Sequence, residues 1–311
     1  VFAVGRFAPR LRDVVGVALA LATLALVVAD TSLDPTSKLF ALIFTAIGAV
    51  MVVYSVGYMG EAEHVDRYWF FAFLMIGSLL GLTTAHEFGN FYVFWELMTW
   101  TSYFLVVHEQ TPKALRAGLI YFVMCAGGAY VMHLGILLVH AQVGSFEFAV
   151  IATRIGDVAP GIGLAAALCL FVGFAVKAGL VPLQAWLPLA HPVAPASVSG
   201  PLSGILTKAG LFGLVKVLFV VFGLGALGRF SLLGLDVGSL LAILGAATLI
   251  YGGLRALTET ELKRMLAFST LAQVGEIAAV VGLGTALAVD AGLLHVVNHA
   301  AMKTLAFFAA G

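Results

Sequence analysis

The strongest constraint on this chain is a series of apolar segments, each long enough to cross a bilayer, joined by short connections. A helix needs about 20 apolar residues to span the hydrocarbon of a membrane. Of the 311 residues, 62% are hydrophobic and only 10% are charged, which is too apolar for a soluble domain of this length. The sequence therefore predicts an all-α fold, a polytopic transmembrane bundle forming one domain over residues 1–311. Ten helices are expected, at 13–30, 38–58, 68–86, 88–108, 115–141, 161–181, 196–224, 237–257, 263–284 and 286–311.

Lysine and arginine in the connections predict the orientation, because cytoplasmic loops carry an excess of these residues. The side of residue 1 carries Arg6, Arg10, Arg12, Arg67, Lys113, Arg116, Arg255, Lys263 and Arg264. The opposite side carries Lys38, Arg154 and Arg229. We therefore expect residue 1 on the cytoplasmic side of a bacterial or archaeal inner membrane.

Several classes of function are disfavoured by the sequence. The formal net charge of zero argues against a nucleic-acid partner. Cys125 and Cys169 lie alone in apolar segments, a spacing that predicts no iron–sulfur cluster, zinc site or disulfide. The sequence also has no nucleotide-binding loop, so we expect no cofactor in this chain.

Titratable residues inside the spans are the main functional signal, because such groups are costly in lipid and usually face a bundle interior or a hydrated path. Structural ion pairs between helices are the alternative, but a buried pair stabilises a bundle poorly compared with apolar packing. The candidate residues are Glu96, Lys177, Lys208, Glu276, His295, His299 and Lys303.

The segment HVVNHAAMK places three of these residues on one helix face. His295, His299 and Lys303 are at positions i, i+4 and i+8, which lie at about 0°, 40° and 80° around a helix. The rise along the helix axis from the first to the last is about 12 Å. Groups about 6 Å apart can exchange protons through one or two waters. Because lysine is a poor metal ligand while protonated and the segment HVVNHAAMK contains no Asp, Glu or Cys ligand, a proton relay fits better than a metal site.

Lys177 lies in an apolar run that Pro182 interrupts five residues later. A broken helix is tolerated in a membrane only where protein or water, and not lipid, surrounds it. Burial lowers the pKa of a lysine in general, whereas a nearby carboxylate raises it. If Glu96 approaches Lys177, the lysine keeps its proton; if Glu96 withdraws, the proton can leave toward Lys208.

Other polar residues have simpler interpretations. Lys216 is near a helix end, where its ammonium group can extend to the interface. His133 is interpreted as a hydrogen-bonded interior histidine. Four residues at loop edges are expected to be solvated, namely His86, Glu87, His108 and Glu109.

The run KAGLVPLQAWLPLAHPVAPASVSGPLSGILTKAG resembles the core signature of the antiporter-like membrane subunits of respiratory complex I. The wider family includes Mrp-type antiporter subunits and large membrane subunits of energy-converting hydrogenases. The part from AHPVAP onward most resembles the hydrogenase-4 and formate-hydrogenlyase branch. WELMTWTSYFLV, ETELKRMLAFSTLAQVG and HVVNHAAMKTLAFFAAG match at three further places in the same order, so the resemblance covers roughly residues 34–311.

The resemblance implies roles for the candidate residues. Glu96 matches the family's fifth-helix glutamate, Lys177 the lysine of its discontinuous seventh helix, and Lys208 its eighth-helix lysine. His295, His299 and Lys303 match the stripe on its eleventh helix. These roles imply a proton path along the middle of the membrane.

The same resemblance implies how the helices are organised. The matching helices are fourth, sixth, seventh and tenth here, and the constant offset of one predicts that a first helix is missing. With Val1 in place of methionine and an apolar C-terminus, we expect truncation at both ends. The family's inverted five-helix repeats would be residues 68–224 and, incompletely, 237–311.

Glu276 departs from the family pattern, because an apolar or aromatic residue is expected after LAQVG. By repeat symmetry its helix corresponds to the helix of Glu96. We interpret Glu276 as a second-repeat counterpart of Glu96; the alternative is a locally paired acid.

The resemblance implies translocation of protons, or of sodium, by a non-redox membrane subunit of a complex I-like oxidoreductase. Redox chemistry in other membrane and peripheral subunits would drive it. The first alternative is an Mrp-type secondary cation/proton antiporter subunit without a redox partner. The second is a subunit that only anchors a peripheral complex.

Overall fold

Ten long helices form the structure, a computed structural model that describes residues 9–60, 62–232 and 234–311. All ten lie close to the predicted ranges, so the prediction of a polytopic helical bundle is confirmed. Val1 and Arg6 lie outside the described residues. The helices are α2 (Pro9–Ala29), α3 (Pro35–Tyr58), α4 (Val65–Thr84), α5 (Phe88–Val106), α6 (Pro112–Val143), α8 (Pro160–Ala178), a composite helix over 196–223, α13 (Val237–Thr258), α14 (Leu262–Gly282) and α15 (Ala286–Ala309).

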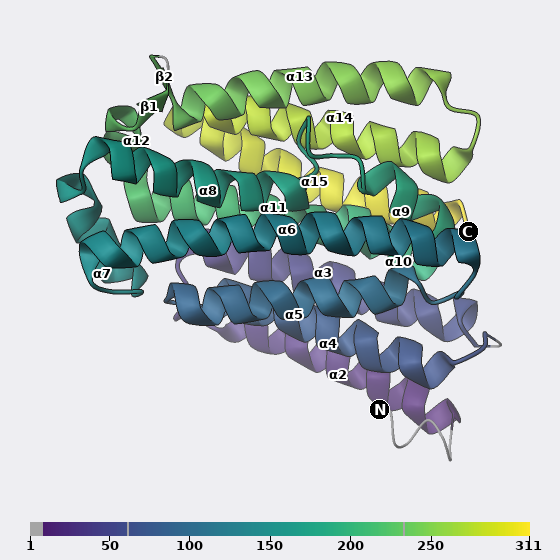
Figure 1. Cartoon of the computed structure of the whole chain (residues 1–311). Helices are drawn as coiled ribbons and strands as arrows, with labels where there is room; N and C mark the ends of the chain where they lie inside the picture. Colours follow the sequence, from purple (N-terminus) through teal and green to yellow (C-terminus); the bar gives the residue numbers. More distant parts are fainter. Residues whose placement is uncertain (1–8, 61, 233) are drawn as a thin grey trace.

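The long helices run in alternating directions, with α2–α5 on one side of the molecule, α13–α15 on the other, and α6, α8 and α11 between them (Figure 1). Eight helices in the described part of the chain are both long and apolar enough to cross a membrane. Two further helices, α5 and α15, are of similar length but more polar. These two carry Glu96 and the His295–Lys303 stripe, whereas Lys177, Lys208 and Glu276 lie on helices counted among the eight.

Short elements close the two ends of the bundle and were not expected from the sequence. Near one end lie α7 (Phe148–Arg154), a 3-10 turn (Ile155–Asp157), α12 (Leu224–Arg229) and the antiparallel pair β1 (Ser231–Leu232) and β2 (Leu235–Asp236). We call this the hairpin end. The helix α9 (Leu187–Val193) lies toward the opposite end, beside the α13–α14 connection, and we call that the α9 end (Figure 1).

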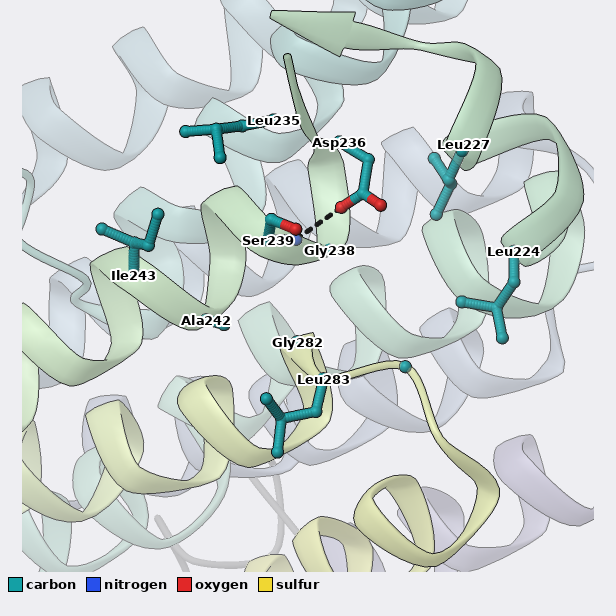
Figure 2. Close-up of a pocket in the computed structure, with 12 residues that line it drawn as sticks. Leu224, Leu227, Leu235, Asp236, Gly238, Ser239, Ala242, Ile243, Gly282 and Leu283 are labelled. Carbon is teal, nitrogen blue, oxygen red and sulfur yellow. Dashed lines mark hydrogen bonds between the residues drawn. The ribbon is translucent and has the colours of Figure 1, made fainter. Parts of the chain in front are cut away.

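A cavity of about 590 Å³ opens at the hairpin end between α12, β2, α13 and the end of α14 (Figure 2). Leu224, Leu283 and Ile243 line it. Its single carboxylate, Asp236, caps α13 by accepting a 2.6 Å hydrogen bond from the Ser239 backbone N–H. None of the seven candidate residues lines this cavity, so it is separate from the site described below.

The seventh predicted span is one composite helix with two π-helical stretches. It consists of α10 (Ala196–Pro201), a π stretch (Leu202–Leu206), α11 (Thr207–Gly213) and a second π stretch (Leu214–Gly223). Wider π turns within helices occur often at functional sites. Lys208 lies in the short α segment between the two.

The chain breaks after α8 as Pro182 predicts. Gly179 ends the helix with a left-handed backbone at φ +84°, a conformation that glycine adopts without strain, and the Val181–Pro182 peptide bond is cis. Hydrogen bonds hold the loop that follows, since the Val181 N–H donates to Thr248 Oγ1 at 2.9 Å. Trp186 also donates its indole N–H to the Val176 carbonyl at 2.7 Å. The break therefore leaves Lys177 close to the end of a well-held helix.

Close contact between α8 and α11 depends on Gly210. A Cβ atom there would lie 2.4 Å from the Ala178 nitrogen and 2.7 Å from the Phe174 carbonyl oxygen, which are backbone atoms that cannot rotate away. This glycine therefore sets how closely the helices that carry Lys177 and Lys208 approach.

We expect Gly210→Ala to destabilise the full-length protein by about 1–3 kcal/mol, the usual cost of overpacking a close contact. Gly127→Ala is the matched control, since a Cβ at this exposed position in α6 meets nothing within 4 Å. Thermal unfolding in detergent should show a lower Tm for the first variant only. Equal Tm values for both variants would contradict the close packing.

Candidate functional site

Lys177 is held by hydroxyl groups from two other helices. Its side chain is 1% exposed, and Nζ donates to Thr99 Oγ1 at 2.9 Å and to Tyr121 OH at 3.3 Å. Tyr121 OH is in turn 2.5 Å from Ser102 Oγ. Hydroxyls donate as well as accept, so this cluster can bond the lysine in either protonation state.

Glu96 lies one turn before Thr99 on α5 and does not form a contact ion pair with Lys177. The pair is close enough to interact electrostatically, and Glu96 lies also beside Tyr92 and His133. Among the described residues, Oε1 of Glu96 is buried without a hydrogen-bond partner. The carboxylate therefore acts on Lys177 through space, with Thr99 on the same helix face making the direct contact.

Lys208 is fully buried and joins two of the predicted groups directly. Its Nζ lies 2.6 Å from His299 Nδ1, and it donates to the Ser203 carbonyl at 2.6 Å. The Ser203 carbonyl belongs to the first π stretch of the composite helix. The hydrogen bond between Lys208 and His299 links α11 to the stripe on α15.

The stripe on α15 has the geometry that its spacing predicts. The ring centroids of His295 and His299 are 6.2 Å apart, and His299 is fully buried. Lys303 is 4% exposed and donates to Ser269 Oγ at 2.6 Å. His295 is the more exposed end of the stripe, with its side chain 28% accessible.

Glu276 lies beside His295 and not beside Lys303. Gln273 bridges the two, because its Nε2 donates to Glu276 Oε2 at 3.2 Å while its Oε1 lies 2.9 Å from His295 Nε2. The direct distance from His295 Nε2 to Glu276 Oε2 is 3.8 Å. A cavity of about 220 Å³ between α14 and α15 is lined by Glu276 and His295. The acid is thus placed to influence the exposed end of the stripe.

Three of the four lysines that are buried in the described part of the chain, Lys177, Lys208 and Lys303, share one property. Among the described residues, no carboxylate oxygen lies within 4.0 Å of the Nζ atoms of Lys177, Lys208 or Lys303, the distance that defines an ion pair here. Their contacts are with hydroxyls, a carbonyl, an imidazole and, for Lys177, the Cys125 thiol. The interpretation of these residues as structural ion pairs therefore finds no support.

Lys216 does form an ion pair. Its Nζ contacts Asp34, which also caps α3 by accepting a 3.2 Å hydrogen bond from the Ser37 N–H. Lys216 is thus paired near the hairpin end, where the sequence predicted only an ammonium group extended toward the interface.

Two of the simpler expectations for histidines were wrong. His133 is exposed on the outer face of α6, where its ring lies 4.6 Å from that of Tyr92, and so it is not an interior histidine. His108, expected to be solvated, is buried beyond the end of α5, with Nε2 3.1 Å from the Glu63 carbonyl. Burial lowers the pKa of His108 and the neighbouring Arg67 guanidinium lowers it further, which favours the neutral ring.

The hydroxyl and amide partners were missed in the sequence. Weak signals for two of them exist: Thr99 follows Glu96 by three residues and Gln273 precedes Glu276 by three, so each pair shares a helix face. No local pattern pairs Ser269 with Lys303, because they lie on different helices.

The fold and this series of buried groups define a polytopic helical membrane protein with several titratable side chains in its interior. Residues 85–311 match the family described as "NADH:quinone oxidoreductase/Mrp antiporter, TM", and residues 25–69 match "NADH-Ubiquinone oxidoreductase (complex I), chain 5 N-terminus". The chain therefore belongs to the NADH:quinone oxidoreductase/Mrp antiporter family of membrane subunits, as its motifs indicated.

Relatives come from both redox-linked and antiporter complexes. Hydrogenase-4 component B of Escherichia coli (strain K12) is 34% identical over 294 residues, covering 90% of this chain and 42% of that protein. An archaeal membrane-bound sulfane sulfur reductase contains a chain with a TM-score of 0.82 and 26% identity, covering 96% of this chain and 63% of that one. A chain of the Mrp complex from Dietzia sp. DQ12-45-1b has a TM-score of 0.85 and 25% identity, covering 98% of this chain and 36% of that one. This chain thus spans less than half the length of its hydrogenase relative.

Proposed function

We propose that this chain is part of a proton-translocating membrane subunit of a complex I-like oxidoreductase, driven by redox chemistry in other subunits. The observation that carries the proposal is a set of three buried lysines on three different helices, Lys177, Lys208 and Lys303, with no carboxylate partner in the described part of the chain. An unpaired ammonium group in a dry interior is costly, and such groups in membrane proteins usually belong to ion paths. Because a lysine can release its proton, these groups can carry one.

The proposal includes an order for the transfer. The charge of Glu96 biases Lys177, whose proton passes toward Lys208. The 2.6 Å contact between Lys208 and His299 carries it to the α15 stripe, and Lys303 lies one turn further. Through Gln273, Glu276 biases His295 as a counterpart of the action of Glu96 on Lys177.

The relatives support further parts of the proposal. The chain would assemble with other membrane and peripheral subunits and would carry out no electron transfer itself. The ranges 68–224 and 237–311 would be inverted repeats. The excess of lysine and arginine in the connections at the α9 end favours placing that end in the cytoplasm, in a bacterial or archaeal membrane.

The likeness to a chain of the Mrp complex supports a second candidate function. In that case an ion gradient, of sodium for example, would drive translocation without a redox partner. The buried residues would act in the same way, and only the driving force would differ.

Inverted membrane vesicles containing the full-length protein in its native assembly test the two functions. We expect acidification of the vesicle interior when the electron donor of the co-purifying redox subunits is added, and none with an imposed sodium or potassium gradient alone. Acidification by the gradient alone would favour the antiporter. If neither treatment acidifies the vesicles, a role as an anchor replaces both.

A further inference from the structure

His191 is a buried histidine that the path described above does not include. It lies in α9, is fully buried, and both its ring nitrogens lack a hydrogen-bond partner in the described part of the chain. Its ring stacks on Phe307 of α15 with centroids 4.4 Å apart and an interplanar angle of 12°. Phe307 is four residues after Lys303, so His191 lies about one helical turn, roughly 5–6 Å, beyond the stripe toward the α9 end.

Packing alone does not explain a histidine at this position. A phenylalanine would stack equally well and would bury no polar atoms. Leaving a buried polar group without a partner costs about 1–3 kcal/mol, and the imidazole has two. The ring nitrogens therefore need transient hydrogen-bond partners, such as a water molecule or a protonated neighbouring group.

Three lysines lie near His191. Lys303, Lys263 and Lys208 all interact electrostatically with the ring. Lys263 Nζ donates to the Ala194 carbonyl at 3.1 Å, one helical turn from His191. Ser199 Oγ lies 3.0 Å from the His191 carbonyl and 3.3 Å from the Ala194 carbonyl, so the backbone of α9 links the two groups.

The Lys263 side of this arrangement reaches the surface. Lys263 is half-buried at the start of α14, and the carboxylates of Glu261 and Glu109 act on it. Both glutamates are exposed, on the α13–α14 and α5–α6 connections. Acids around a basic group at the mouth of a path can collect protons from the solution.

We propose that His191 carries protons between the surface at Lys263 and the buried Lys303. One ring nitrogen takes up a proton from the Lys263 side and the other releases one toward Lys303, so the ring returns to its neutral form without any change of electrons. The path would thus have a lateral uptake branch at the α9 end, built by α9, α14 and α15. This inference rests on the proposed function.

The first test is His191→Phe in the full-length protein within its native assembly. This change keeps the stacking and removes both nitrogens. We expect translocation to fall by about tenfold or more, in line with the loss of a positioned proton carrier. His140→Phe is the matched control, because His140 also stacks on a phenylalanine, Phe146, with centroids 4.0 Å apart near the hairpin end. It should keep the wild-type rate.

A second variant separates proton transfer from structure. His191→Ala leaves space for a small ring, so added imidazole should restore translocation while thiazole, of similar shape but far less basic, should not. Equal rescue by both compounds would mean that the ring only fills space, and an unchanged rate in His191→Phe would also overturn the proposal. The rate of His191→Phe and the rescue of His191→Ala are independent results, so one of them still tests the proposal if the other variant assembles poorly.

Comparison with Lys208→Met distinguishes failure of this inference from failure of the proposed function. If Lys208→Met stops translocation and His191→Phe does not, the path stands and the uptake branch is wrong. If Lys208→Met has no effect, the proposed function itself is wrong.

Discussion

Lys208→Met should stop proton translocation, lowering the initial rate at which inverted vesicles acidify by about 100-fold. Methionine preserves the length and apolar stem of lysine but cannot hold a proton. The substitution also removes the contact with His299 at 2.6 Å, the only direct hydrogen bond between two candidate residues within the described part of the chain. Stability should fall little, because a buried charge is exchanged for an apolar group of similar size.

Lys113→Met is the control for this experiment. Lys113 is an exposed lysine near the start of α6, at the α9 end, and lies apart from the buried groups. We expect vesicles that contain the Lys113→Met variant to acidify at the wild-type rate. Full activity of Lys208→Met at normal protein level would exclude Lys208 from the path.

The second large effect is expected at Lys177, where arginine should be as inactive as methionine. An arginine keeps the positive charge but holds its proton at any physiological pH, so it cannot pass the proton on. If Lys177 served only as a fixed charge for Glu96 and the hydroxyls of Thr99 and Tyr121, arginine would preserve function. The acidification rate of vesicles with Lys177→Arg therefore separates a proton carrier from a fixed cation.

Thr99→Val tests the surroundings of Lys177 in the same assay. Valine has the shape of threonine but removes the 2.9 Å contact to Nζ. We expect an intermediate rate, since Tyr121 still bonds the lysine. A rate equal to wild type in Lys177→Arg, with a loss in Thr99→Val, would point to a structural role for this cluster.

Much of the fold follows from local sequence. The apolar segments predict the ten long helices, and Pro182 predicts a break near Lys177, although α8 already ends at Ala178, before the predicted bound of 181. The i, i+4, i+8 spacing places His295, His299 and Lys303 on one face without any tertiary information. These features depend only on the period of the helix and on the backbone preferences of proline and glycine.

Contacts between helices could not be predicted in the same way. Nothing near Lys177 in the sequence points to Thr99 or Tyr121, which come from α5 and α6. The absence of a contact ion pair with Glu96 likewise depends on how α5 packs against α8. His191 was missed because a histidine next to a proline in a loop-like stretch looks solvated, whereas α9 folds back into the bundle.

The π stretches on either side of Lys208 also have no clear signal in the sequence. The run LSGILTKAGLFGLVKV reads as an ordinary apolar helix. The wider turns become visible only once the helix is packed against its neighbours, where the Ser203 carbonyl bonds to the lysine side chain. Local propensity is a weak guide where tertiary contacts select the winding of the helix.

The central claim is that the buried lysines carry the translocated protons, and the number of protons moved per electron pair tests it most directly. Wild-type and Lys208→Met assemblies, reconstituted into the same liposomes at equal protein content, would be compared by recording proton uptake and substrate oxidation together. We predict a lower ratio of protons to electrons in the variant, because electron transfer elsewhere in the assembly no longer moves protons through this chain. An unchanged ratio would contradict the account.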